Sequence, residues 1–182
     1  MKRIIIIGSL LVLLIVGGSY LATHPLSFNA NEDTSNQSVE FSENGITLLM
    51  PGNWVSADSS SNTSVLAIAD PNSKDSSGFN DINVNIEKKS NAGYLESEFK
   101  SNYNTLARNS DFDILFEGNV TFNGESASEA DYLSTVNGTA KQHKAVWVQK
   151  DSDIYVILCS APQDKFDEEL SKFDFIINNV QL

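Results

Sequence analysis

The chain begins with an uninterrupted run of apolar residues. Residues 4–22 carry no charge, and the first charged residue after them is Glu32. As an α-helix this run would be about 28 Å long, close to the thickness of a bilayer's hydrocarbon core. Lys2 and Arg3 precede the run and nothing basic follows it closely, which favours a cytoplasmic N-terminus and an external C-terminal part. The pattern predicts an N-terminal transmembrane helix, used as an anchor or as a signal segment, in residues 1–22.

Two fates are open to this segment. Signal peptidase could cut after Ser19, because Gly17 and Ser19 are small residues at the spacing that the enzyme requires, and the protein would then be secreted. We favour retention, which gives a single-pass protein of the cell membrane with an extracytoplasmic C-terminal domain. Residues 23–38 are rich in Asn and Ser and show no apolar periodicity, so they predict a flexible polar linker.

Residues 39–182 begin with short apolar runs of strand length. These runs cover residues 39–41, 46–50, 64–69 and 81–87, and an Asn-Gly turn separates the first two. The fourth run alternates strictly, with apolar Ile82, Val84 and Ile86 on one side. Its other side carries Asn83, Asn85 and Glu87. This alternation predicts a sheet with one face packed and one face in water.

Two segments have the period of an amphipathic helix. Leu95, Phe99, Tyr103 and Leu106 recur at intervals of three and four residues, and Ser90 or Asn91 could cap the first turn. A second apolar stripe follows Pro162, at which the second helix is expected to begin. Its members are Phe166, Leu170, Phe173 and Ile177.

Between these helices, four strands follow one another through two-residue turns. The strands are expected at residues 112–122, 125–136, 141–150 and 153–159, separated by Asn123-Gly124, Asn137-Gly138 and Asp151-Ser152. Asn-Gly pairs supply the positive φ angles of tight hairpins, so the segment predicts an antiparallel meander. The last strand is apolar on both faces and should be central. The fold class is therefore α+β, with an antiparallel β-sheet sandwiched by helices.

Charge and cysteine content argue against a nucleic-acid partner and against an internal disulfide. All 24 acidic residues follow position 31, and without Lys2 and Arg3 only 10 basic residues oppose them, which leaves a charge of −14 outside the anchor. Such a surface repels phosphate backbones, so we expect no nucleic-acid partner. The single Cys159 cannot form an internal disulfide, and its apolar neighbours predict a buried thiol.

The candidate chemistry is sparse, and we predict no catalytic residue, metal site or cofactor. His143 is the only histidine of the domain; its neighbours place it at the surface of a strand, and no Gly-x-Ser-x-Gly motif accompanies it. A hydrolase using His143 stays an alternative. Asp70, Asn72 and Asp75 share a polar loop and offer oxygen ligands without the spacing of an EF-hand. A divalent-cation-linked assembly factor is therefore a second alternative.

Four Asn-x-Ser/Thr sequons could accept N-glycans in an exported protein. Their acceptor residues are Asn36, Asn62, Asn119 and Asn137. Asn62 lies in a serine-rich loop and is expected to be the most accessible of them.

Residues 39–180 resemble the PsbP-like family, relatives of an extrinsic photosystem II subunit. The resemblance rests on residues 45–54 with their Pro51-x-x-Trp54 turn, on the polar-faced strand from Asp81, and on the order of the following helix, hairpins and closing helix. It implies an antiparallel sheet between helices and a role in binding or assembly without catalysis. We can match no ion-binding residue of the photosynthetic members to this chain.

The predicted function is accordingly a non-enzymatic module, tethered to the membrane by its N-terminal helix, that binds a protein or cell-envelope component. The candidate binding surface consists of the polar strand side and the polar loop. Its residues are Asn83, Asn85, Glu87, Asp70, Asn72 and Asp75.

Overall fold

The computed structural model describes residues 37–76, 78–136 and 138–182. The predicted anchor and most of the predicted linker lie outside these residues. Within the described part of the chain, no helix is both long enough and apolar enough to cross a membrane.

The main element is a seven-stranded antiparallel sheet with the order β3-β4-β5-β9-β8-β7-β6. The predicted meander is confirmed, and the apolar last strand, β9, is the central strand. From one edge to the other, the strands are β3 (Val55–Ser56), β4 (Ser64–Ala69), β5 (Asn83–Lys89), β9 (Asp153–Pro162), β8 (Thr139–Lys150), β7 (Glu125–Val136) and β6 (Phe112–Phe122).

A separate two-stranded sheet is formed by β1 (Ser38–Glu43) and β2 (Ile46–Pro51). Its turn has φ angles of 51° at Asn44 and 81° at Gly45, and the β6–β7 turn repeats them with 50° at Asn123 and 85° at Gly124. Two consecutive positive φ values are the signature of the type I′ hairpin. The Asn-Gly pairs therefore act as predicted in both hairpins.

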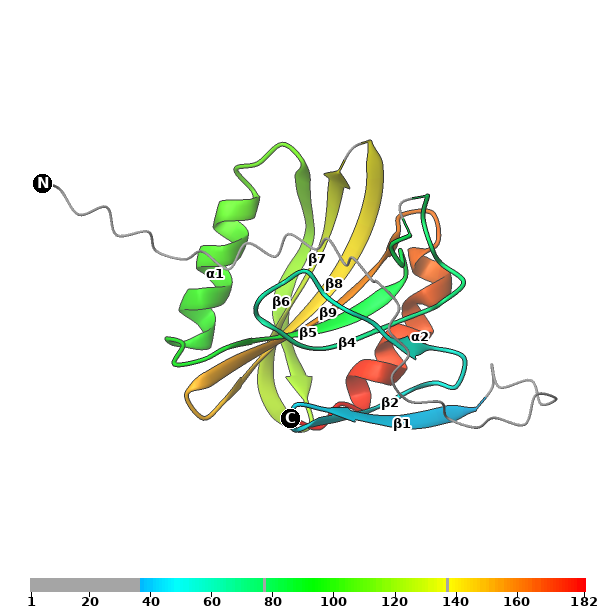
Figure 1. Ribbon diagram of the computed structural model, residues 1–182. Helices are drawn as coiled ribbons and strands as arrows, with labels where there is room; N and C mark the ends of the chain where they lie inside the picture. The colour runs from blue at the N-terminus through cyan, green and yellow to red at the C-terminus, as the bar shows by residue number, and fades with distance from the viewer. Residues whose placement is uncertain (1–36, 77, 137) are drawn as a thin grey trace, which may run out of the picture.

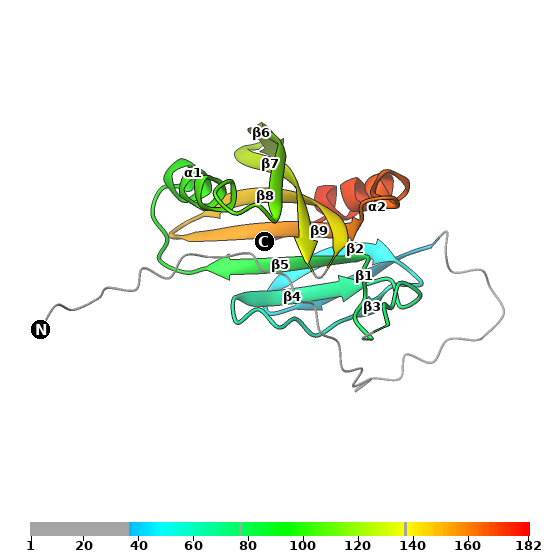
Figure 2. The ribbon, with the colours of Figure 1, turned by 90° about the horizontal axis from the view of Figure 1, so that it is seen from above.

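The two helices pack on opposite faces of the large sheet. Trp147 of β8 belongs to the apolar cluster under α1 (Leu95–Leu106), whereas its neighbour Val148 belongs to the cluster under α2 (Phe166–Asn178). Successive residues of a strand point to opposite faces, which fixes this arrangement. Figure 1 shows the β1–β2 hairpin beside α2, and Figure 2 shows the twisted β6–β7 end of the sheet between the two helices. The predicted sandwich is confirmed.

Three local predictions were wrong. Pro162 does not open a helix, because β9 continues through it in register with Lys141 of β8. The short strand β3 was not predicted, since two residues carry no periodicity. Helix α1 uses neither Ser90 nor Asn91 as its cap: Tyr94 occupies the N-cap position without a capping side-chain hydrogen bond.

Candidate functional site

The polar side of β5 is buried, contrary to the sequence-based prediction. Asn83, Asn85 and Glu87 are exposed by only 2%, 0% and 2%, so they do not form a wet sheet face. The start of β4 and the residue before it supply hydroxyl partners for Asn85 and Glu87. Thr63 Oγ1 donates to Glu87 Oε2 at 3.0 Å, and Ser64 Oγ donates to Asn85 Oδ1 at 2.5 Å.

These contacts make a small internal polar network. Asn85 Nδ2 donates to the other Glu87 oxygen at 3.1 Å, and burial raises the pKa of the Glu87 carboxyl, with hydrogen bonds from Ser61, Thr63 and Asn85 opposing the rise. Asn83 donates through Nδ2 to the Asn80 carbonyl, whereas its Oδ1 is buried and has no partner among the described residues. The network joins β5 to the chain before β4 and leaves these three side chains inaccessible to a surface partner.

The sequence does contain an indication that this side of β5 is buried, although the strict alternation of the strand suggested an exposed polar face. Asparagine is unfavourable inside a strand, and two of them at alternate positions require partners if the strand is central. The hydroxyl-rich stretch 59–64, which leads into the neighbouring strand β4, supplies such partners to Asn85 and Glu87. Alternation shows that a strand has two different faces; it does not show that the polar face stays in water.

His143 is also buried, at 3% exposure, so its predicted surface position was wrong. The Nε2 atom lies 2.7 Å from Ser134 Oγ, and Nδ1 lies 2.8 Å from Ser160 Oγ. The imidazole stacks on Tyr132, with the ring centroids 4.6 Å apart. Burial, aided by nearby Lys141, lowers the pKa of His143 to about 3. Both nitrogens of a neutral imidazole are therefore engaged by serine hydroxyl groups.

The polar loop after β4 uses its carboxylates to fix its own turns. Asp70 Oδ1 accepts a hydrogen bond from the Asn72 N–H at 2.9 Å, and Asp75 Oδ1 accepts one from the Phe79 N–H at 2.9 Å. Such bonds are the usual reason for Asp in turns. Asn72 is exposed, and the two aspartates are half-buried. Across the described ranges, no group of three or more His, Cys, Asp or Glu side chains is arranged to hold a metal ion.

A cluster of three carboxylates around Lys144 was not predicted. Lys144 Nζ lies 3.1 Å from Asp174 Oδ1 of α2 and 3.4 Å from Glu129 Oε2 of β7. Burial and the nearby Glu129 raise the pKa of Asp131, the third carboxylate, to about 6. The cluster links α2 to the sheet. Glu129 and Asp131 are neighbours on one side of β7, but Lys144 and Asp174 come from β8 and α2, so no local pattern could reveal the cluster.

Two of the predicted sequons can be placed. Asn62 and Asn119 are both exposed, in the connection before β4 and on β6 respectively. Asn36 and Asn137 lie outside the described residues. Glycosylation of any of the four stays a prediction.

Comparison with known proteins decides the family. A family model described as PsbP-like protein matches residues 4–182. The chain belongs to the PsbP-like family. The resemblance seen in the sequence is thereby confirmed, and the match includes the apolar N-terminal run as well as the folded domain. No curated protein sequence matches this PsbP-like chain.

Two solved structures show the same fold. Cyanobacterial PsbP (CyanoP) from Synechocystis sp. PCC 6803 is 16% identical, with a TM-score of 0.59 over 87% of this chain and 99% of that one. LpqN, described as involved in cell envelope biogenesis of Mycobacterium tuberculosis, is 18% identical, with a TM-score of 0.55 over 80% of this chain and 90% of that one. At these identities the likeness establishes the PsbP-like fold alone.

Proposed function

We propose that this PsbP-like protein is a non-enzymatic binding or assembly module, held outside a cell membrane by its N-terminal segment. The family match begins at residue 4 and so includes the apolar run that would form the anchor. LpqN, which shares the fold, is described as involved in cell envelope biogenesis. A protein or cell-envelope component is therefore the proposed partner, and the charge of −14 outside the anchor argues against nucleic acid.

The environment of His143 is the observation that carries the non-enzymatic part of the proposal. A triad needs a base that can reach the substrate and an acid that orients the base. His143 is 3% exposed, and serine hydroxyls occupy both of its nitrogens. This arrangement supports a structural role for His143 and gives the alternative hydrolase no support.

The cation-linked alternative finds little support as well. In the loop that suggested it, Asp70 and Asp75 each already accept a backbone hydrogen bond. These bonds give both aspartates a role in fixing the turns of the loop, which explains their presence without a bound cation. Binding to a macromolecular partner is therefore the function that we propose.

The experiment is performed on the full chain in the cells that make it. A C-terminal tag is added, intact cells are treated with external protease, and a parallel culture is crosslinked before membrane solubilisation. We expect the domain to be digested from outside while a cytosolic marker survives, and a discrete partner to co-purify with the tagged chain. An intact chain in the cytosolic fraction, or the tagged chain alone after crosslinking, contradicts the proposal.

A further inference from the structure

Strand β6 is the longer of the two edge strands of the seven-stranded sheet. It pairs only with β7, along Phe112–Phe122, so its outer side has no strand neighbour among the described residues. An unpaired edge presents N–H and C=O groups that can extend the sheet. The pairing with β7 is interrupted once, by a register shift between Ile114 and Phe116. Residues 116–122 form the longer regular part of this edge.

Two large apolar side chains are exposed at the shift. Leu115 is 50% exposed and Phe116 is 45% exposed, and both are among the few exposed large apolar residues of the described chain. Gly118 accommodates the Phe116 ring, because a Cβ atom at position 118 would lie 2.5 Å from Phe116 Cζ. The ring therefore lies along the strand. Leu115 and Phe116 together give the edge an apolar anchor of the kind that interfaces use.

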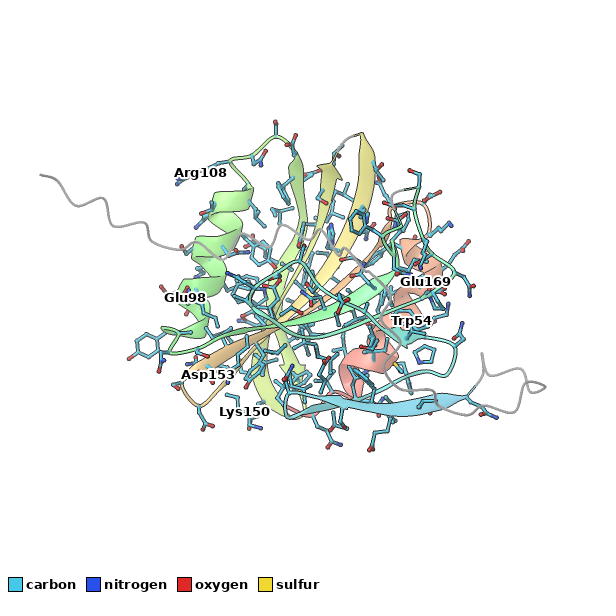
Figure 3. The ribbon with its side chains drawn as sticks, viewed as in Figure 1. Trp54, Glu98, Arg108, Lys150, Asp153 and Glu169 are labelled. Carbon is cyan, nitrogen blue, oxygen red and sulfur yellow. The ribbon has the colours of Figure 1, made fainter. Side chains whose placement is uncertain are left out.

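The edge is acidic; Lys100 of α1 interacts with Glu117 only through space, without a contact of ion-pair length. No Lys or Arg occurs between Arg108 and Lys141. Arg108 itself points outward from the end of α1 (Figure 3). Exposed carboxylates lie on and beside β6 and form no ion pair within the described part of the chain: Asp111, Asp113, Glu117 and Glu125. Asp113 is opposite Leu133 and Glu117 is opposite Ala130 on β7, so these two acids flank the edge on opposite faces.

We propose that the β6 edge binds an extended, basic polypeptide segment, which adds to the sheet as an eighth strand. Main-chain hydrogen bonds to residues 116–122 supply the pairing, Leu115 and Phe116 contact apolar side chains, and Lys or Arg side chains meet Asp113 and Glu117. The proposal rests on the proposed binding function and names its surface and the chemistry of its partner. A second copy of this chain fits poorly, because pairing β6 with itself brings like charges together.

The sequon at Asn119 has a consequence for this edge. Asn119 is exposed and lies within residues 116–122. A glycan there would obstruct an added strand. The proposal therefore requires the mature protein to be unmodified at Asn119, which the mass of tryptic peptides reports directly.

The test uses the full chain in detergent micelles and a fluorescent nine-residue peptide of alternating Lys-Lys and Val-Val pairs, which carries Lys on both faces when it is extended. Fluorescence anisotropy measures the dissociation constant for the native chain, for D113K/E117K, and for the control E40K/D58K. The control makes the same charge change at two exposed positions outside the β6 edge: Glu40 on β1, and Asp58 just after β3 at the other edge of the sheet. We expect D113K/E117K to bind at least tenfold more weakly and the control to bind nearly as the native chain does. A peptide with alternate N-methylated amides should also bind at least tenfold more weakly, because its backbone cannot donate hydrogen bonds to the β6 edge.

The possible outcomes distinguish a failure of the β6-edge proposal from a failure of the proposed binding function. Equal binding by D113K/E117K and the native chain, equal binding of the N-methylated peptide, or no binding at all overturns the proposal. If D113K/E117K fails to fold, D113N/E117N is compared with the native chain instead, and we expect a smaller loss of affinity for the peptide. A native-membrane partner that still co-purifies with the folded charge-reversed variant rejects the edge and leaves the proposed function standing. A chain found only in the cytosol rejects the proposed function, whatever the peptide result.

Discussion

Hydroxyl groups make the burial of polar side chains possible in this domain. A serine hydroxyl is hydrogen-bonded to each ring nitrogen of His143, and Thr63 donates a hydrogen bond to one carboxylate oxygen of Glu87. A buried polar group without a partner costs about 1–3 kcal/mol, so each hydroxyl offsets a penalty of that order. The serines and threonines are short and bond without adding charge. This explains how a strand such as β5 can be polar on one side and still lie inside the fold.

The buried imidazole predicts a definite pH dependence. Burial lowers the pKa of His143 to about 3 in the folded chain, whereas an unfolded histidine has a pKa near 6.5. Between these values only the unfolded chain binds the proton, so the free energy of unfolding falls as pH falls from 6.5 toward 3. The His143 contribution amounts to about 2 kcal/mol between pH 7.5 and pH 5.

The measurement is urea unfolding of the native chain and of His143→Gln at both pH values. The glutamine cannot gain a proton, so the other titrating groups, Asp131 among them, affect both proteins alike. We expect the variant to be less stable at pH 7.5 by about 1–3 kcal/mol, through its altered contacts with Ser134 and Ser160. Its stability should then fall less between pH 7.5 and 5 than that of the native chain. Parallel pH profiles for the two proteins would show that His143 does not titrate as the structure implies.

At the scale of elements, helix α1 begins without its usual cap. Tyr94 is the N-cap residue, it makes no capping hydrogen bond, and its side chain is 84% exposed. A serine at an N-cap accepts a hydrogen bond from the second or third helical N–H group, which stabilises a helix by about 0.5–2 kcal/mol relative to alanine. We expect Tyr94→Ser to raise the free energy of unfolding by about 1 kcal/mol in urea titration. Tyr94→Ala is the control, and a gain of equal size in both variants would exclude capping as the cause.

The elements that the sequence predicted well are those whose signals are local. The Asn123-Gly124 pair favours the positive φ angles of a tight turn, so the sequence alone predicted the bounds of β6 and β7 correctly. The N-terminus of α2 was misplaced, because Pro162 suits both a first helical turn and a strand end, and only pairing with Lys141 decides between them. The burial of Asn85 and Glu87 was missed for the same reason, because their hydroxyl partners lie some twenty residues earlier in the chain.

At the scale of the whole molecule, the described residues of the domain build two apolar clusters. Their described members, including those that pack at the borders, run from Phe41 to Leu182. Seven ion pairs, two of them made by Lys144, also join described residues. We therefore expect folding to depend on the domain, and any attachment to a membrane to depend on the segment before it.

This separation predicts the behaviour of a chain without residues 2–22. Because the truncation removes none of the described cluster members, the truncated chain should fold and unfold cooperatively. We expect its Tm to lie within about 2 °C of that of the full chain, which corresponds to about 0.5–1 kcal/mol for a domain of this size. It should also leave the membrane fraction, since the charge of −14 outside the anchor favours solubility and is repelled by anionic lipid. Circular dichroism during heating and cell fractionation measure the two properties separately. A truncated chain that folds but stays with the membrane would assign the attachment to the domain surface, and one that cannot fold would show that the N-terminal segment contributes to the core.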